Sequence, residues 1–342
     1  MSIFDWFKNR SEQLDPNHPL AELIQFGCDK AVALTNPQLK LLRDWRQRLV
    51  PAVAGSIDFL RAQVAMLPAA HALAPAHWAS DPALRAFFAT PRDIESVLAG
   101  SQSLHALFDQ YPELAEACVV LGMSCQEQKG FGMALQGQTI QRDVAQVTVN
   151  FSDYKIRLCE RDEALLRRVI GVEVFEYLVG QALAEIGALR SERQELQRDC
   201  ALIRTRLRLL QQHGSGLASM LGDAPAAQSE QARLTAELLE NERQLKEIGA
   251  SHTALATEIE CLREVLAQPQ NYLHLEPKRL RLSTMNVVLD PASTEQAADV
   301  EFAIIEGRGH APVRRAFILA RVARTDLPPP QRFDLQNAIR YL

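Results

Sequence analysis

The sequence predicts a mixed α+β protein that is mostly helical, and three observations indicate this. Ala, Leu, Arg and Gln are plentiful and aromatic residues make up only 6%, a balance that favours helices. Two long segments repeat apolar residues at alternating steps of three and four, which is typical of coiled-coil helices. A segment at 144–151 alternates apolar and polar residues, as half-buried strands do, and further strands are predicted within 278–324. We expect an N-terminal helical bundle, a small antiparallel β-rich domain, and a long antiparallel coiled-coil hairpin inserted in that domain.

Length and composition limit the class of protein. The 342 residues are 47% hydrophobic and 23% charged, enough for an ordinary core and about two domains. This excludes a wholly disordered, collagen-like or disulfide-stapled chain. The net charge of −5 argues against a general polyanion binder. The six cysteines show no CxxC spacing, and we find neither a signal peptide nor an apolar run long enough to span a membrane. We therefore expect reduced thiols and a cytoplasmic protein.

Residues 1–130 are predicted to form the helical domain. Proline after a capping residue marks the first turn of a helix, and Asp93 completes a capping box with Thr90. Helix starts of this kind are expected at Asn36-Pro37, Ser80-Asp81-Pro82, Thr90-Pro91 and Tyr111-Pro112. The last helix is expected to present one apolar face. That face would consist of Leu114, Cys118, Leu121 and Cys125.

Residues 131–180 and 269–342 are predicted to form the β-rich domain. The first segment is expected to hold a strand at 144–151, a turn at Ser152-Asp153, a partner strand at 154–158 and a helix over 162–178. The second is expected to hold strands at 278–289, 300–305 and 313–324, followed by a short terminal helix. Because a two-stranded sheet is marginal by itself, we expect one sheet assembled across the insertion. Two separate small sheets are the alternative.

Residues 181–268 are predicted to form the hairpin arm. The seam on its first helix runs from Ala182 to Leu210, and the seam on its second from Leu234 to Leu266. An antiparallel register places Arg193 at the level of His252, and Asn241 opposite Ile203. A polar layer of this kind fixes register at some cost in stability, and a functional site is the alternative. The first helix carries six basic and four acidic residues and the second four and eight, which favours their pairing.

Two groups of apolar residues are candidates for partner binding. Leu217, Met220 and Leu221 lie between glycines at the tip of the arm, where little core is at hand. A partner contact and a self-packed cap both explain them. Phe4, Trp6 and Phe7 form a short amphipathic segment at the N-terminus. That segment would pack on its own bundle, dock on a protein or touch a membrane interface.

A third group of candidates is basic. Arginines gather in the predicted C-terminal strands, where they could share one sheet face and bind nucleic acid or an anionic surface. Few aromatic residues accompany them, which argues against binding of a single strand or of RNA. A solvated sheet face, or ion pairs with the acidic helix, explains them as well. The residues are Arg279, Arg281, Arg308, Arg314, Arg315 and Arg321.

The sequence contains no nucleotide-binding, hydrolase, zinc-protease or calcium-loop motif. His105, Cys118 and Cys125 could in principle bind a metal, but buried core thiols explain them better, and we predict no catalytic residue, cofactor or metal. We expect a non-enzymatic interaction or scaffold subunit of a cytoplasmic complex, with the arm and its tip as docking elements. Nucleic-acid or anionic-surface binding is the first alternative, and an enzyme with a site between its globular domains is the second. Protein partners are expected, with self-association and peripheral membrane contact as further alternatives.

Overall fold

The computed structural model describes residues 20–136, 139–214, 224–248, 254–290, 296–309 and 312–330. The chain divides into two compact units. One unit consists of Met1–Ile57 and Glu176–Pro269, and the other of Asp58–Phe175 and Gln270–Leu342. The helices α3 (Trp45–Ala65) and α7 (Glu163–Gly214) contribute residues to both. The predicted segments have other boundaries, because the segment 1–130 is divided between the units at Ile57.

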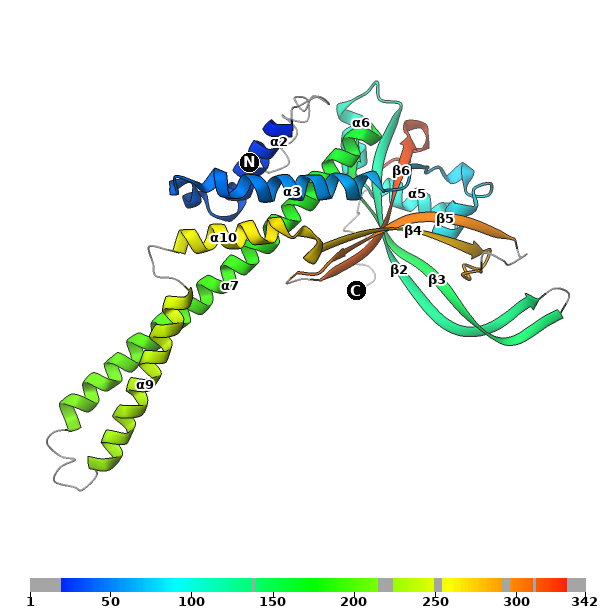
Figure 1. Ribbon diagram of the computed structural model, residues 1–342. Helices are drawn as coiled ribbons and strands as arrows, with labels where there is room; N and C mark the ends of the chain where they lie inside the picture. The colour runs from blue at the N-terminus through cyan, green and yellow to red at the C-terminus, as the bar shows by residue number, and fades with distance from the viewer. Residues whose placement is uncertain are drawn as a thin grey trace, which may run out of the picture. The chain divides into compact units, whose positions relative to one another are not determined.

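One sheet forms the centre of the second unit (Figure 1). Its order is β3-β2-β6-β5-β4, and these neighbours are all antiparallel. The two-residue strand β1 (His71–Ala72) adds a short parallel pairing to β6. The strands are β2 (Glu116–Gln136), β3 (Thr139–Glu160), β4 (Leu273–Ser283), β5 (Ala297–Gly307) and β6 (Val313–Ala323). The prediction of helices combined with one antiparallel sheet is confirmed, and the alternative of two separate sheets is wrong.

The segment after β4 joins the two edges of this sheet. Bridges pair Val287 with Thr148 of β3, and Val288 with Leu282 of β4. The Val288 N–H donates to the Val147 carbonyl at 2.8 Å, and the Leu289 N–H to the Arg281 carbonyl at 2.8 Å. Some backbone groups on the outer edges of β3 and β4 are therefore hydrogen-bonded to this segment. The two edges are less available for pairing with a strand of another chain.

The apolar segment near residue 118 is a strand and not the predicted helix. β2 begins at Glu116, and no helix starts at Tyr111-Pro112. Consecutive residues 117–121 are all buried, because the strand is covered on both faces. A continuous apolar run fits a buried strand as well as a helix. The spacing of Leu114, Cys118, Leu121 and Cys125 was therefore no evidence of helical periodicity.

The predicted turn at Ser152-Asp153 is also wrong, because β3 continues through it. The pairing with β2 shifts there, so that Asp153 and Tyr154 together oppose Met123. Asp153 has a φ of 53°, in the left-handed region that Asp tolerates better than most residues. The two polar residues mark a β-bulge, which redirects a side chain without ending the strand.

Three short helices pack on one face of the sheet, and the sequence signals for two of their starts are confirmed. They are α4 (Pro82–Phe87), α5 (Pro91–Ala99) and α6 (Gln102–Gln110). Asp81 caps α4, and Thr90 forms the predicted capping box with Asp93 at α5. Phe87 of α4 meets Phe151 and Phe302 edge-on, with ring centroids 5.0 and 6.4 Å away. These rings lie in the main core.

The first unit is helical. It contains α2 (Leu20–Thr35), the 3₁₀ turn η1 (Pro37–Leu41), most of α7, α9 (Ala224–Ile248) and α10 (Ala254–Ala267). Further 3₁₀ turns are η2 (Pro75–His77), η3 (Pro269–Asn271) and η4 (Arg324–Asp326). Asn36 caps η1 as predicted. Among the described residues, no helix is both long and apolar enough to cross a bilayer.

Buried polar contacts hold the helices of the first unit together. Glu258 of α10 accepts hydrogen bonds from Arg190 of α7 at 2.7 Å and from the Asn36 side chain at 2.6 Å. Burial raises the pKa of Glu258, but the hydrogen bonds from Arg190 and Asn36 outweigh it and leave that pKa below its usual value. Lys30 of α2 forms an ion pair with Glu176 of α7. Each buried charge therefore has a partner of opposite sign.

Candidate functional site

The second half of α7 lies beside α9 (Figure 1). From 193 to 210 the less exposed positions of α7 follow steps of three and four, while the residues between them are exposed. These positions are Arg193, Leu196, Cys200, Ile203, Leu207 and Leu210. Cys200 and Ile203 are fully or nearly buried, as is Leu234 on α9. The apolar stripe of each helix thus faces the interior of the pair.

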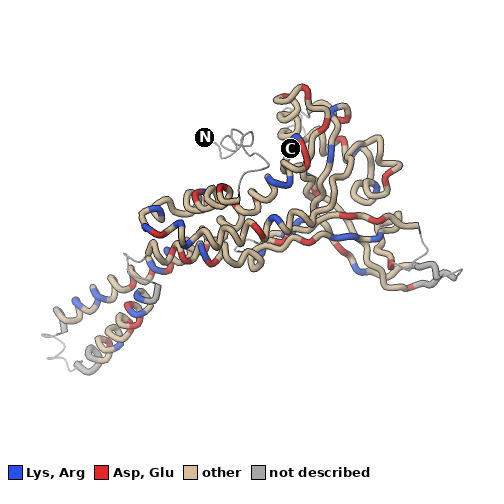
Figure 2. The backbone as a smooth tube through the Cα atoms, turned by 45° about the horizontal axis from the view of Figure 1, so that its top comes forward, with Lys and Arg blue, Asp and Glu red and all other residues tan. Residues whose placement is uncertain are grey.

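Ion pairs connect the two helices beside this stripe. Arg204 meets Glu242 at 2.7 Å, and Arg206 meets Glu230 at 2.6 Å. Figure 2 shows basic and acidic residues interspersed along the paired helices. The arginine side chains are more than half exposed, so each pair contributes less than about 1 kcal/mol to stability. Their main effect is to favour one arrangement of the helices over others.

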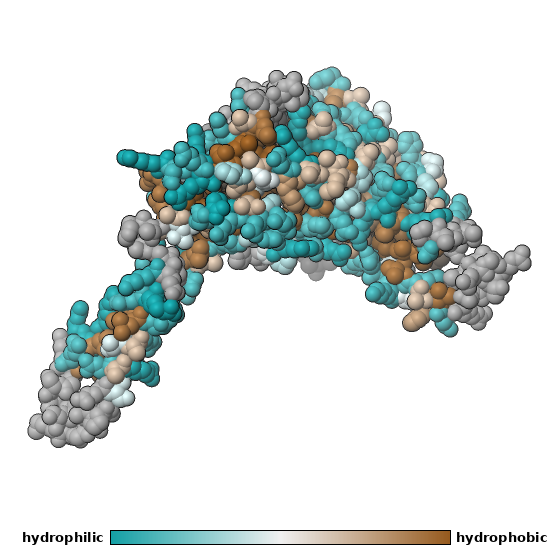
Figure 3. Space-filling model, viewed as in Figure 1, coloured by the Kyte–Doolittle hydropathy of each residue, from teal (hydrophilic) through white to brown (hydrophobic). Residues whose placement is uncertain are grey.

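Leucines outside the stripe remain in solvent. Leu202 is 68% exposed and Leu209 is 50% exposed, and they lie seven residues apart on the same side of α7. Leu239 of α9 is 63% exposed. Figure 3 shows apolar atoms among hydrophilic ones on the surface of the paired helices. Sequence reasoning missed these residues, although the spacing of seven between Leu202 and Leu209 was a visible signal.

All six predicted apolar candidates lie outside the described residues. This applies to Leu217, Met220 and Leu221 at the tip, and to Phe4, Trp6 and Phe7. His252 also lies outside the described part, so its level relative to Arg193 stays a prediction. Arg193 is half-buried, and its charge helps to lower the pKa of Glu258. Asn241 is half-buried on α9.

The predicted anion-binding arginines are divided between the two faces of the sheet. In the strand register, Arg279 of β4 is opposite Glu301 of β5, and Arg281 of β4 is opposite Asp299 of β5. Arg315 of β6 is opposite Ile305 of β5. Residues 299, 301 and 305 share one face of the sheet, because side chains two apart in a strand point the same way. Arg279, Arg281, Arg315 and Arg321 therefore lie on that face. Arg314 pairs with Glu306 on the opposite face, and Arg308 follows the end of β5.

Several of these arginines already have carboxylate partners. Arg279 lies 2.9 Å from Asp299 and 3.5 Å from Glu301. Arg308 lies 3.0 Å from Glu306, and Arg315 lies 2.7 Å from Asp153. The partners come from the sheet itself and not from the acidic helix. A shared basic face therefore exists, with part of its charge neutralised.

The bulge in β3 borders a pocket on the same face of the sheet. Its volume is about 200 Å³. Asp153 accepts hydrogen bonds from Arg315 at 2.7 Å and meets Lys155 at 2.9 Å, and these cations lower the pKa of Asp153. The lining residues are Val120, Gly122, Asp153, Lys155, Arg157, Leu158, Ile170, Glu173, Val174, Ile305, Arg315, Ala316 and Phe317. Nothing in the sequence pattern indicated this pocket, because four strands and one helix contribute to it.

A second pocket, of about 470 Å³, lies between α4 and the end of β4. Arg85 is the one charged side chain among its lining residues, which include Trp78, Met285 and Asn286. Its wall also includes Gln296, which adjoins residues outside the described part of the chain. Most of its polar groups are uncharged, so it offers little with which to select a ligand.

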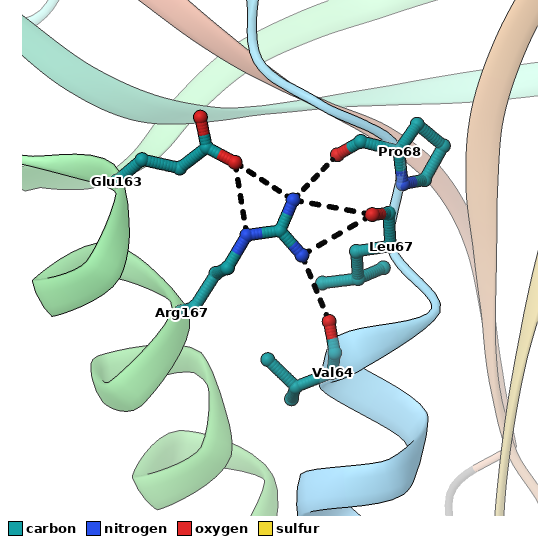
Figure 4. A network of polar contacts seen from close by, with 5 residues as sticks. All are labelled: Val64, Leu67, Pro68, Glu163 and Arg167. Carbon is teal, nitrogen blue, oxygen red and sulfur yellow. Dashed lines mark hydrogen bonds and ion pairs between the residues drawn. The ribbon is translucent and has the colours of Figure 1, made fainter.

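Arg167 is a contrasting, structural arginine (Figure 4). Its Nε and Nη2 atoms donate to Glu163 at 2.9 and 2.7 Å. Its Nη1 and Nη2 atoms also donate to three carbonyl oxygens at the end of α3, those of Val64, Leu67 and Pro68, at 2.8–3.2 Å. Carbonyls at the end of a helix have no partners within it, so this side chain closes α3 and fixes the first turn of α7.

Five of the six thiols are poorly suited to nucleophilic chemistry at neutral pH. Burial raises the pKa of Cys28, Cys118 and Cys159 to about 11, and that of Cys261 to about 12. Burial also raises the pKa of Cys125. Because the thiolate is the nucleophile and the metal ligand, these values favour the buried-thiol interpretation of Cys118 and Cys125.

Neither metal-site geometry nor relatives indicate a function. Within the described ranges, no three or more His, Cys, Asp or Glu side chains are grouped as metal ligands. No family model matches the chain, and comparison with curated proteins and with solved structures found no significant match. A functional proposal therefore depends on the paired helices, the arginine face and the pocket.

Proposed function

We propose that the chain is a non-enzymatic interaction subunit of a protein complex, and that α7 and α9 form an antiparallel coiled-coil arm that docks a protein partner. This arm would be shorter than the predicted segment 181–268, because Glu258 of α10 is hydrogen-bonded to Asn36 of the first unit. The observation that carries the proposal is the exposure of Leu202 and Leu209 outside the stripe that pairs α7 with α9. Two leucines one heptad apart are the spacing with which a partner helix makes contact.

The surroundings of these leucines define the chemistry of the partner. Arg198 lies one turn before Leu202 on the same side of α7; it is exposed and forms no ion pair among the described residues. An amphipathic helix with acidic residues beside its apolar stripe would match this surface in both respects. A second copy of this chain is the main competing partner, because two arms could pair into four helices.

A double substitution tests the proposal. Leu202→Glu with Leu209→Glu introduces two charges where apolar contact is expected and leaves the stripe between α7 and α9 intact. Gln194→Glu with Gln197→Glu adds the same charges at exposed positions of α7 without removing an apolar side chain. Tagged versions of both would be purified from the source cells, and the proteins bound to each would be quantified by mass spectrometry.

We expect the leucine pair to lose at least one partner that the glutamine pair retains, with equal helix content by circular dichroism. Sedimentation of the purified proteins shows whether that partner is a second copy. Equal recovery of every bound protein by the two variants and the unsubstituted chain would contradict the proposal.

A second candidate function is the binding of nucleic acid or another polyanion. It is favoured by the common sheet face of Arg279, Arg281, Arg315 and Arg321. Binding of this kind weakens steeply as salt increases. Titration of labelled DNA and RNA at two salt concentrations would detect it, and absence of salt-dependent binding would exclude it. The carboxylate partners of Arg279 and Arg315 are the reason for placing it second.

A further inference from the structure

The pocket beside the β3 bulge has an apolar floor. Val120 of β2, Leu158 of β3, Ile305 of β5 and Phe317 of β6 line it, and α7 adds Ile170 and Val174. Val120 is opposite Leu158, and Gly122 is opposite Phe317, so these residues share one face of the sheet. Gly122 has no side chain on this floor, and the Arg157 side chain packs against its backbone. A hydrocarbon group placed here would be removed from water on the side that faces the floor.

Charged side chains surround this floor, and the positive ones are in excess. Lys155, Arg157 and Arg315 are cationic, and Asp153 and Glu173 are anionic. Lys155 and Arg315 both bind Asp153, and Arg315 also donates to Ser124 at 2.7 Å. The bulge turns Asp153 toward these cations, while Tyr154 beside it bonds the Phe151 carbonyl at 2.6 Å. Two of the three cations are therefore held by one carboxylate.

Arg157 is the cation that the protein leaves without a partner. Across the described ranges, no hydrogen bond or ion pair joins it to another residue. Its stem packs over Gly122, since a Cβ atom built there would lie 3.7 Å from the Arg157 Cγ and 3.6 Å from the Lys155 carbonyl oxygen. The guanidinium thus belongs to the wall of the pocket and has donors available. A planar guanidinium binds a carboxylate through two parallel hydrogen bonds.

We propose that this pocket binds a small amphipathic monocarboxylate, with its carboxylate on Arg157 and its short hydrocarbon chain on the floor. The volume of about 200 Å³ lies below the roughly 300–1,000 Å³ usual for drug-sized ligands, so a small molecule fits and a long lipid chain does not. This site is independent of the docking surface on α7. Binding here would place a ligand against the first half of α7 and strands β2, β3, β5 and β6.

Hexanoate is a suitable probe, titrated against the full chain by ligand-observed NMR. Hexanamide keeps the chain and lacks the charge, and formate keeps the charge and lacks the chain. We expect saturable binding of hexanoate and weaker binding of both analogues, because charge and apolar contact each contribute. Absence of saturable hexanoate binding in the low millimolar range, or equal binding of hexanamide, would overturn the proposal.

Two substitutions locate the binding, each with a matched control. Arg157→Gln is expected to weaken hexanoate binding about tenfold or more, as loss of a charged hydrogen-bond donor does. Arg92→Gln removes an exposed arginine of α5 and should leave binding unchanged. Gly122→Leu fills the pocket and should abolish binding, whereas Gly130→Leu adds the same side chain to an open part of β2. If Gly122→Leu fails to fold, Arg157→Gln alone tests the site. An unchanged affinity of this variant for hexanoate would overturn the proposal.

Discussion

The apolar residues in the two halves of α7 differ in how exposed they are to solvent. In the first half, Leu166, Ile170, Val174 and Leu178 are at most 6% exposed. In the second half, the seam is covered but Leu202 and Leu209 are left in solvent. The first half also has one exposed leucine, Leu183 at 40%, but most of its large apolar residues are buried, whereas Leu202 and Leu209 in the second half are more exposed than Leu183. The exposure of Leu202 and Leu209 is therefore a feature of the second half of α7 and not of the whole helix.

The polar contacts of α7 follow the same trend. Arg167 in the first half is surrounded by one carboxylate and three carbonyls (Figure 4). Further along the helix, Arg190 donates to the buried Glu258 carboxylate, which also accepts from the Asn36 side chain. Arg204 and Arg206 in the second half make exposed pairs. We therefore expect the stability effects of substitutions to decrease along the helix, and the effects on partner binding to appear where stability effects are small.

Arg167→Met should have the largest effect on stability. It removes the donor that Glu163 and the carbonyls of Leu67 and Pro68 share, and one of the two donors to the Val64 carbonyl, which keeps the Leu67 N–H. We expect a loss of about 3 kcal/mol in the free energy of unfolding, measured by urea denaturation. Arg157, which is exposed and has no partner among the residues that the structure describes, is the control, and Arg157→Gln should leave the urea midpoint unchanged. Equal midpoints for the two variants would show that Arg167 is not a structural brace.

Glu258→Gln should have an intermediate effect that depends on pH. The folded pKa of Glu258 lies below its usual value, so its charge stabilises the fold above the unfolded pKa of about 4.3. That contribution is lost as pH falls through the folded pKa. We expect the variant to be less stable by about 1–2 kcal/mol at pH 7, with a smaller difference at pH 3. A difference that is constant between these pH values would contradict the role of the charge.

Substitution of both Leu202 and Leu209 by Glu should change stability little, within about 0.5 kcal/mol, because both side chains are exposed. Thermal unfolding followed by circular dichroism measures this directly. Loss of several degrees in the melting temperature would mean that these leucines belong to the fold, and the contrast between the two halves of α7 would fail.

Arg204→Ala should have the smallest effect. Its pair with Glu242 is largely exposed, so we expect less than about 1 kcal/mol at low salt and less still at high salt. Urea denaturation at two salt concentrations measures it. A large effect, or one that is independent of salt, would indicate that the pair is shielded from solvent.

Local signals in the sequence predicted local structure well. Asp81 and the Thr90–Asp93 box mark helix starts because capping depends on residues within one turn. Three strands were also predicted within 278–324, the last of them from a centre, Phe317-Ile318-Leu319, that is apolar on both faces. The segment near Cys118 was misassigned because both faces of β2 are covered, which removes the alternation. Asp153 was read as a turn because a bulge and a turn use the same residue types.

The candidate sites depended on pairing that a single sequence does not contain. Whether Arg315 is free or bound to Asp153 is decided by the register of β3, β2 and β6. The packing of Arg157 over Gly122 depends on the same register. Leu202 and Leu209 differ, because their position outside the 3–4 series could have been derived from the sequence once the seam was assigned.

The most direct test of the docking proposal is site-specific photo-crosslinking in the source cells. A photoreactive residue at Leu209 is compared with one at Gln197, which is exposed elsewhere on α7. The proposal predicts that position 209 crosslinks to a defined protein and that position 197 does not. The absence of a crosslink at 209, or the same products from both positions, would contradict a docking surface on this side of α7.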